Sequence, residues 1–135
     1  MMKDNKMRFS TIIAAAALAL ATVGAPSVAV AHTRVVSSSP TEGATVSRPR
    51  ALTLTFSEPL LTPTVATSIV MTAMPGMANH SPMVIRNFQT AWSNGNKTLT
   101  LNLREPLRTG TYEVRWQAAG ADGHRMTGTV HFTVS

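Results

Sequence analysis

Apolar and polar residues alternate one by one in several short runs of this chain, and this pattern constrains the fold more than any other feature. A period of two indicates strands with one buried face, and no comparable helical periodicity follows residue 31. The four clearest runs carry their apolar residues at Leu52, Leu54 and Phe56, at Leu99, Leu101 and Leu103, at Tyr112, Val114 and Trp116, and at Val130, Phe132 and Val134. Less regular alternation over residues 34–38, 65–71 and 82–89 brings the prediction to about seven strands.

Turn-forming residues divide these runs, most clearly at 40–43, 93–96 and 107–110. The arrangement predicts an all-β chain, a seven-stranded antiparallel β-sandwich with Greek-key connections, of the immunoglobulin-like or cupredoxin-like kind. The stretch that ends at Tyr112 also resembles a tyrosine corner, in which a tyrosine hydroxyl bonds to the backbone a few residues upstream.

The first 31 residues have the organisation of a secretory signal. Three basic residues, Lys3, Lys6 and Arg8, precede an apolar run of 12 residues from Ile12 to Val23, and Ala29-Val30-Ala31 is a small-x-small cleavage site. The run is shorter than the roughly 20 residues that a spanning helix needs. We therefore expect residues 1–31 to be removed, and residues 32–135 to be exported as one domain that does not insert into the membrane.

Composition narrows the chemistry of that domain. The chain has 135 residues and no cysteine, which excludes a disulfide framework, thiolate metal sites and a cysteine nucleophile. Histidine, methionine and carboxylate side chains remain as metal ligands. The cations are scattered between Arg34 and Arg125 without aromatic platforms, so we expect no nucleic-acid partner.

One segment is chemically unusual for a β-sandwich. It carries Met71, Met74, Met77, His80 and Met83, spaced as MxxMxxMxxHxxM. Pro75, Gly76 and Pro82 would break a helix here, so the segment is predicted to be a loop. Side chains three apart can point the same way in an extended segment, and thioether sulfur is a soft donor that suits Cu(I). The alternative is that the methionines fill gaps in the core or form an adaptable surface.

A second group of potential ligands is dispersed along the chain. His32 would be the first residue after cleavage, and could offer both its α-amine and its imidazole to one metal ion. With a further imidazole from His124 and a carboxylate from Asp122 or Glu58, it would form the nitrogen and oxygen set that Cu(II) prefers. Taken singly, each of these residues is also typical of turns and solvated loops. Their spacing alone does not bring them together.

Two nearby residues receive structural interpretations. His131 falls on the polar face of the last predicted strand and is interpreted as a solvated strand residue. Met126 follows the proposed Cu(II) residues, but a thioether suits Cu(II) poorly, so it is interpreted as a packing residue.

The chain resembles the CopC/PcoC family of periplasmic copper-binding, copper-resistance proteins, over the whole region from His32 to Val134. The resemblance is carried by His32, SSSPTEG at 37–43, LTFSEPL at 54–60, MTAMPGMANHSPM at 71–83, GTYEVRW at 110–116, ADGH at 121–124 and TGTVHFTV at 127–134. The methionine segment is the most specific part, because many members of the family lack it.

This resemblance implies a β-sandwich with two copper sites at opposite ends, one for each oxidation state. Cu(I) ligands would come from Met71, Met74, Met77, His80 and Met83, and Cu(II) ligands from His32, Asp122 and His124, with Glu58 as a further or weaker ligand. The implied partner is a membrane copper transporter or a multicopper oxidase. One departure is Arg125, where the family usually has proline, which places a cation beside the Cu(II) residues.

The resulting prediction is a copper carrier or buffer for copper resistance and homeostasis, and not an enzyme. Two alternatives remain. A terminal histidine with a second histidine resembles the histidine brace of oxidative copper enzymes, although a carboxylate ligand would occupy positions that oxygen needs. The other alternative is a metal-free immunoglobulin-like interaction module with the methionine segment as its surface.

Overall fold

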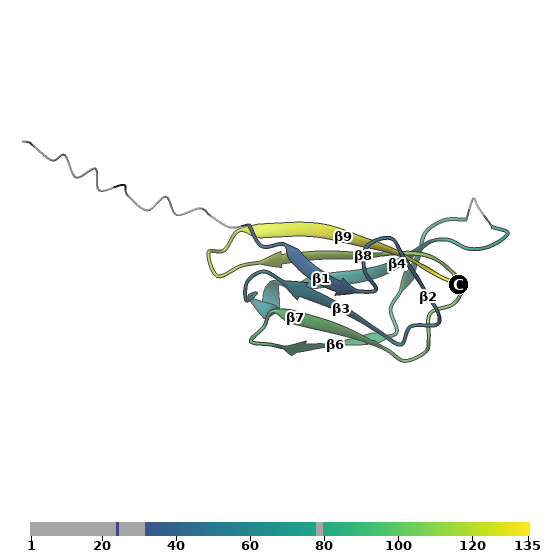
Figure 1. Cartoon of the computed structure of the whole chain (residues 1–135), viewed down its shortest axis with the longest axis horizontal. Helices are drawn as coiled ribbons and strands as arrows, with labels where there is room; N and C mark the ends of the chain where they lie inside the picture. Colours follow the sequence, from purple (N-terminus) through teal and green to yellow (C-terminus); the bar gives the residue numbers. More distant parts are fainter. Residues whose placement is uncertain (1–23, 25–31, 78–79) are drawn as a thin grey trace, which may run out of the picture. The chain divides into compact units, whose positions relative to one another are not determined.

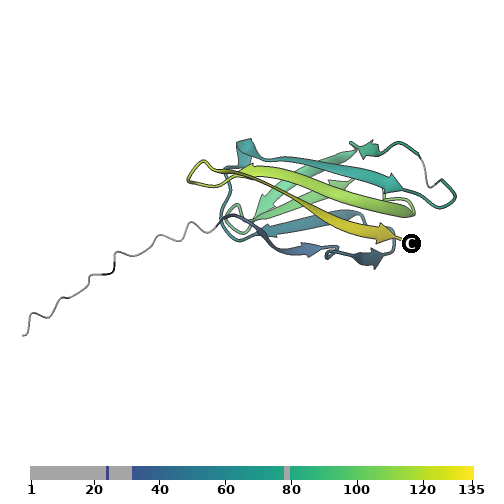
Figure 2. The same ribbon diagram turned by 90° about the horizontal axis from the view of Figure 1, so that it is seen from above.

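The computed structural model describes Gly24, residues 32–77 and residues 80–135, so the predicted signal peptide lies outside the described residues except for Gly24. Residues 31–135 form a compact unit of their own, built of two β-sheets packed face to face (Figures 1 and 2). The described helical structure is one 3-10 turn, Thr62–Thr64, and no helix among the described residues is long and apolar enough to cross a membrane.

The two sheets contain four and five strands. The first has the order β1-β3-β7-β6, with bounds Val35–Ser39, Ala51–Phe56, Thr98–Leu103 and Phe88–Ser93. The second has the order β2-β9-β8-β4-β5, with bounds Ala44–Val46, Arg125–Val134, Gly110–Ala119, Ala66–Ala73 and Met83–Ile85. Figure 2 shows the two layers with the core between them.

Alternation of side chains explains how the core forms. In β3, Leu52, Leu54 and Phe56 are each 1% exposed, while the threonines between them are only half-buried. The other three clear runs also bury their apolar residues in the same core. The prediction of an all-β sandwich is therefore confirmed, since each strand turns one face toward the opposite sheet.

The strand count and the strictly antiparallel pairing were predicted wrongly. The described residues form nine strands. The predicted strand over 82–89 divides, because β5 pairs with β4 in one sheet whereas β6 pairs with β7 in the other. The short β2 runs parallel to β9, and its three residues are too few to show a period in the sequence. The Greek-key connection stays a prediction.

The tyrosine corner is present at the start of β8. The Tyr112 hydroxyl donates a 2.7 Å hydrogen bond to the Arg108 carbonyl, and burial raises the pKa of Tyr112. From this corner β8 runs through ten residues to Ala119. At about 3.3 Å per residue, the strand separates the two ends of the domain by roughly 30 Å.

Candidate metal centres

The methionine segment lies at the end of the domain where β8 begins. Its first and last methionines are in strands rather than in the predicted loop, since Met71 in β4 is paired with Met83 in β5. Met71 is 3% exposed and belongs to the core, whereas Met83 is 51% exposed. A β-carbon at Gly110 would lie 2.7 Å from the Ala73 carbonyl oxygen, so β8 packs closely against the end of β4 here.

Between these strands the chain makes a tight turn. The Met77 amide donates a 3.1 Å hydrogen bond to the Met74 carbonyl, and Gly76 has a φ of 76°, a conformation that glycine adopts at no steric cost. Met74 is half-buried against the core, and Met77 is 53% exposed. The predicted loop is therefore confirmed for Met74 and Met77, and the turn presents their side chains at the domain surface.

His80 has one ring nitrogen in a hydrogen bond and the other without a partner. Its Nδ1 lies 2.7 Å from the Ser81 carbonyl oxygen, which can only accept, so Nδ1 carries the proton. Its Nε2 is buried and has no hydrogen-bond partner among the described residues. A histidine that ligates a metal commonly donates its other ring N–H to a backbone carbonyl in this way.

These donors fit a soft metal ion. Neutral thioethers and one imidazole nitrogen form a set suited to Cu(I), while a harder ion would require oxygen donors. Of the predicted residues, Met77 and Met83 are exposed, and Met74 and His80 are half-buried. Met71 is the buried member of the set.

The segment that begins with His32 lies at the other end of the domain. Arg34 and Ser57 are joined by two hydrogen bonds, Arg34 N to Ser57 Oγ at 3.1 Å and Ser57 N to the Arg34 carbonyl at 2.9 Å. The intervening Thr33 is 6% exposed. A β-carbon at Gly120 would lie 3.2 Å from Thr33 Oγ1, so the segment packs against the turn that joins β8 to β9.

That turn positions Asp122 and His124. Its backbone is closed by a 2.9 Å hydrogen bond from Gly123 N to the Gly120 carbonyl. Asp122 accepts the His124 amide at 3.0 Å with Oδ1, and its Oδ2 lies 2.8 Å from His124 Nδ1. The hydrogen bond with the His124 ring, followed by the bond from its amide, lowers the pKa of Asp122. His124 therefore points Nδ1 at Asp122, which leaves Nε2 as the nitrogen for a metal.

Glu58 is brought to the same end by its neighbours. Ser57 is paired with Arg34, and Leu60 forms a bridge with Gly120, so the half-buried Glu58 lies between residues that contact both other segments. Even so, no three His, Asp or Glu side chains among the described residues are close enough together to hold a metal ion. The structure thus places the predicted residues at one end and joins Asp122 to His124, without gathering the complete set.

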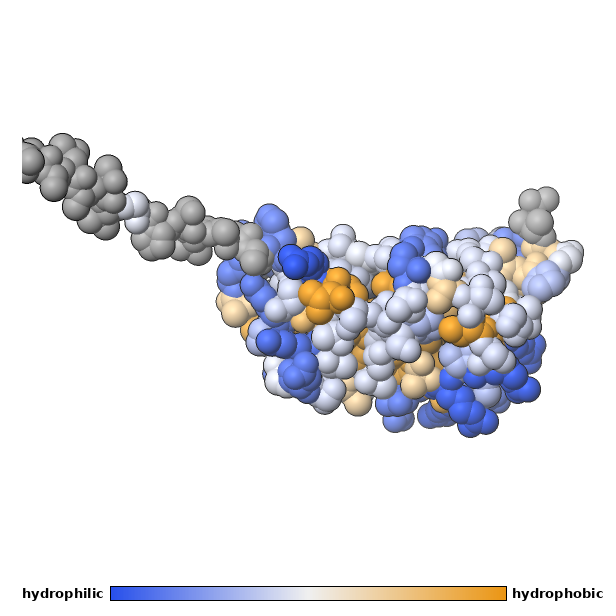
Figure 3. All heavy atoms as spheres, viewed as in Figure 1, coloured by the Kyte–Doolittle hydropathy of each residue, from blue (hydrophilic) through white to orange (hydrophobic). Residues whose placement is uncertain are grey.

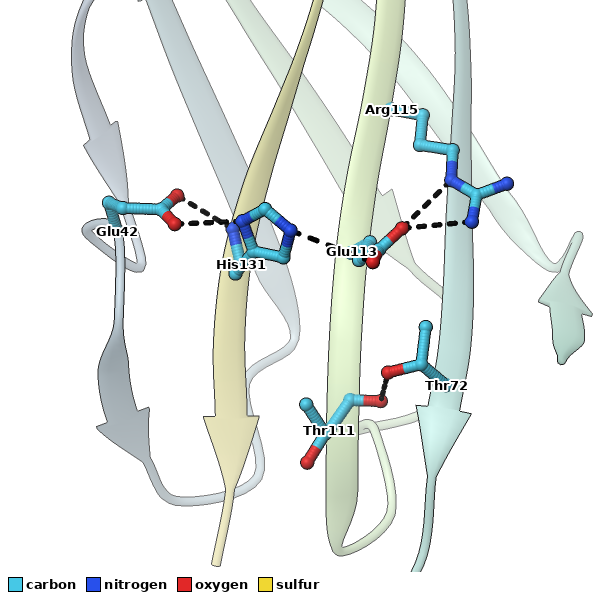
Figure 4. A network of polar contacts seen from close by, with 6 residues as sticks. All are labelled: Glu42, Thr72, Thr111, Glu113, Arg115 and His131. Atoms are coloured by element: carbon cyan, nitrogen blue, oxygen red, sulfur yellow. Dashed lines mark hydrogen bonds and ion pairs between the residues drawn. The ribbon is translucent and has the colours of Figure 1, made fainter. Parts of the chain in front are cut away.

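A polar network on the outer face of the five-stranded sheet lies outside both groups (Figure 4). His131 donates its amide to Glu42 Oε2 at 2.8 Å, its Nδ1 lies 2.8 Å from Glu42 Oε1, and its Nε2 lies 3.6 Å from Glu113 Oε1. Glu113 in turn pairs with Arg115 at 2.9 Å. His131 is on the polar face as predicted, but its partner Glu42 is 89 residues away, and no local spacing indicates that pairing.

Comparison with known proteins agrees with this architecture. The CopC domain model matches residues 35–135. Copper resistance protein C of Pseudomonas syringae pv. tomato is 42% identical over 132 residues, covering 96% of this chain and 97% of the relative. Copper resistance protein C of Escherichia coli is 39% identical over 106 residues, covering 78% and 83%.

A solved structure shows the same fold. PcoC, described as a methionine-rich copper resistance protein from Escherichia coli, superposes with a TM-score of 0.69 at 36% identity, covering 78% of this chain and 100% of that one. The match of the domain model over most of the chain, together with relatives above 30% identity, shows that this protein belongs to the CopC family.

Proposed function

We propose that the protein is a periplasmic copper carrier that binds Cu(I) at the methionine end and Cu(II) at the His32 end, and passes copper to a partner protein. The relatives are copper resistance proteins, and this supports a role in copper resistance. The observation that carries the proposal is the joint presence of exposed thioethers and an unpartnered His80 Nε2 at one end.

At the methionine end, Cu(I) would be held by Met74, Met77, Met83 and the Nε2 of His80. A thioether sulfur is neutral and only weakly hydrated. It can therefore bind a soft monovalent ion without losing a proton. Met71 is the fifth candidate, and its burial means that it would join the set only after a change of side-chain conformation.

At the His32 end, Cu(II) would be bound by the α-amine and imidazole of His32 after cleavage, and by His124 Nε2. Asp122 orients the His124 ring through Nδ1, an arrangement that raises the basicity of a ligating imidazole. Glu58 and Asp122 are the carboxylates available to complete a tetragonal site.

The proposed role is transfer rather than catalysis. Met77 and Met83 are each about half exposed, at 53% and 51%, so a partner could contact the ligands directly. Thioether ligands without a thiolate also allow release of the ion, which a carrier requires. A membrane copper transporter or a multicopper oxidase is the proposed recipient or donor.

The proposal is tested by titrating the exported protein, beginning at His32, with Cu(I) and separately with Cu(II), each against a competing chelator. We expect one equivalent of each ion to bind, and the bound Cu(I) to remain when Cu(II) is added. A Met126→Leu variant is the matched control, because Met126 lies in β9 outside the methionine segment. Failure of both ions to bind tightly would contradict the carrier function.

A further inference from the structure

The charges of the domain are distributed unevenly between its two ends. Residues 32–135 contain nine Lys and Arg residues and five Asp and Glu residues. Four of the nine cations, Arg48, Arg50, Arg104 and Arg108, are in the loops at the methionine end, where Glu105 is the accompanying acid. A fifth, Arg86, lies in the connection between β5 and β6, which a backbone hydrogen bond joins to the loop that carries Arg104. We call these five residues the arginine collar.

Backbone hydrogen bonds bring the collar together. Leu103 N donates to the Arg50 carbonyl at 2.8 Å, and Arg104 N donates to the Asn87 carbonyl at 3.0 Å. Leu107 N donates to the Pro49 carbonyl at 3.2 Å. The loops that carry the five arginines are therefore tied to one another, although they come from three separate parts of the sequence.

The collar arginines are exposed and carry no internal counter-charge. All five are exposed, and within the part of the chain that the structure describes, Arg115 is the one arginine that forms an ion pair. Figure 3 shows strongly hydrophilic residues at the end of the domain that carries the C-terminus, and others at the opposite end. Uncompensated charge of one sign on one end produces a field that attracts an oppositely charged partner.

The collar is continuous with the methionine segment. One shallow depression is lined by Arg48, Arg108 and Thr109, and a neighbouring depression is lined by Thr109, Met74 and Pro75. Met77 and Met83, in the same methionine segment as Met74, are exposed. Arginine and methionine are both enriched at protein interfaces, and an apolar centre with a charged rim is the usual anatomy of such an interface.

We infer that the methionine end is a docking surface for an acidic protein, one that presents clustered Asp and Glu side chains to the arginine collar. Charge attraction would guide the encounter and orient the partner over the methionine segment. The idea that docking serves copper transfer rests on the proposed Cu(I) site, whereas binding of an acidic surface needs no metal.

The test uses the metal-free protein beginning at His32 and a defined probe, a poly-L-glutamate peptide, followed by amide NMR at low salt. We expect shifts confined to residues 46–50, 74–77, 86–87 and 104–110, with binding weakened about tenfold or more when salt is raised through the physiological range. Shifts centred on residues 32–34 and 120–125 would overturn the inference.

Two triple variants with the same change in net charge sharpen the test. Arg48, Arg50 and Arg108 are each changed to Gln in one, and Arg34, Lys97 and Arg125 at the opposite end are each changed to Gln in the other. We expect the first variant to bind the probe about tenfold more weakly than the unaltered protein, and the second variant less than about twofold more weakly. Equal weakening would show a net-charge effect and no docking surface.

Two further measurements distinguish an acidic protein from an anionic membrane, and the docking surface from the proposed Cu(I) site. Vesicles of phosphatidylglycerol that bind the collar more tightly than poly-L-glutamate would overturn the protein partner in favour of an anionic membrane. Cu(I) affinity of the collar variant is measured independently, and we expect it to be unchanged. A chain that binds the probe but no Cu(I) would refute the proposed Cu(I) site and leave the docking surface standing.

Discussion

The two ends of this domain differ in how their proposed ligands are held. At the methionine end, one continuous hairpin connection supplies every candidate, anchored by the pairing of Met71 with Met83. At the His32 end, three separate segments supply them, joined through contacts around Gly120. Thioethers at the first end are neutral at every pH, whereas the amine, imidazole and carboxylate of the second end all titrate.

Under the proposed function, this difference lets one β-sandwich provide separate sites for two oxidation states of copper. A local connection can vary without altering the core, while the His32 end depends on tertiary contacts between distant segments. The two ends are separated by the roughly 30 Å of β8, so a change at one should leave the other unaffected. The following predictions test that independence, in order of expected effect.

Replacing Met74 and Met77 together by Leu removes two sulfur ligands while nearly conserving volume. We expect Cu(I) affinity to fall by on the order of 100-fold, about tenfold for each ligand, and Cu(II) affinity to stay the same. Competition titrations of both ions measure the effect, with Met126→Leu as control. A parallel loss of both ions would contradict separate sites.

Adding one glycine before His32 moves the α-amine away from the imidazole chelate. We expect Cu(II) affinity to fall about tenfold or more and Cu(I) affinity to be unchanged. Electron paramagnetic resonance should show loss of one nitrogen from the Cu(II) coordination sphere. An unaltered spectrum and affinity would refute the terminal chelate.

Lowering the pH should separate the two ends without any mutation. Imidazole and amine bind metal only in their unprotonated forms, so Cu(II) affinity should fall steadily as the pH is lowered. Cu(I) affinity should fall less over the same range, since thioether ligands have no proton to lose. Matching pH profiles for the two ions would mean that they share ligands.

Much of the fold followed from the sequence, because strands with one buried face leave a period of two that is visible without any structure. Asp122 and His124 were named as candidate ligands, but the hydrogen bonds between them were not predicted, although they lie only two residues apart. Contacts between distant segments were not predicted, and neither Thr33 against Gly120 nor His131 with Glu42 has a signal in local spacing. The proposed Cu(II) set would require such distant contacts, so its members could be proposed from the sequence but not arranged in space.

Tyr112→Phe tests how much the hydrogen bond of the tyrosine corner contributes to the stability of the domain. The substitution removes a buried hydroxyl and leaves the Arg108 carbonyl without its 2.7 Å hydrogen bond, which should lower the free energy of unfolding by about 1–2 kcal/mol. Urea denaturation of the metal-free protein measures the change, and Cu(II) affinity should not move. Unchanged stability would show that this hydrogen bond contributes nothing.

The smallest expected effect concerns the pKa of Glu42, which belongs to neither proposed copper site. The His131 amide is the main cause that lowers the pKa of Glu42, with the His131 ring contributing less. The ionised Glu42 carboxylate therefore stabilises the folded protein at pH values above the pKa that Glu42 has in the unfolded chain, about 4.3. This stabilisation is lost as the pH falls from that value through the lower pKa of the folded protein. Carboxyl NMR titration should show that His131→Gln keeps most of the lowered pKa and that copper does not alter it. Return of Glu42 to its ordinary pKa in that variant would contradict this account.

The claim that each copper ion has its own end is tested most directly by NMR of the methionine methyl groups. Residues 32–135 contain Met71, Met74, Met77 and Met83 at one end and Met126 at the other. We predict that paramagnetic Cu(II) broadens the Met126 methyl signal and leaves the other four sharp, while Cu(I) shifts signals of the methionine segment and not Met126. Broadening of the segment methyls by Cu(II) to the same extent as Met126, or a Cu(I) shift at Met126 alone, would contradict the two-ended account.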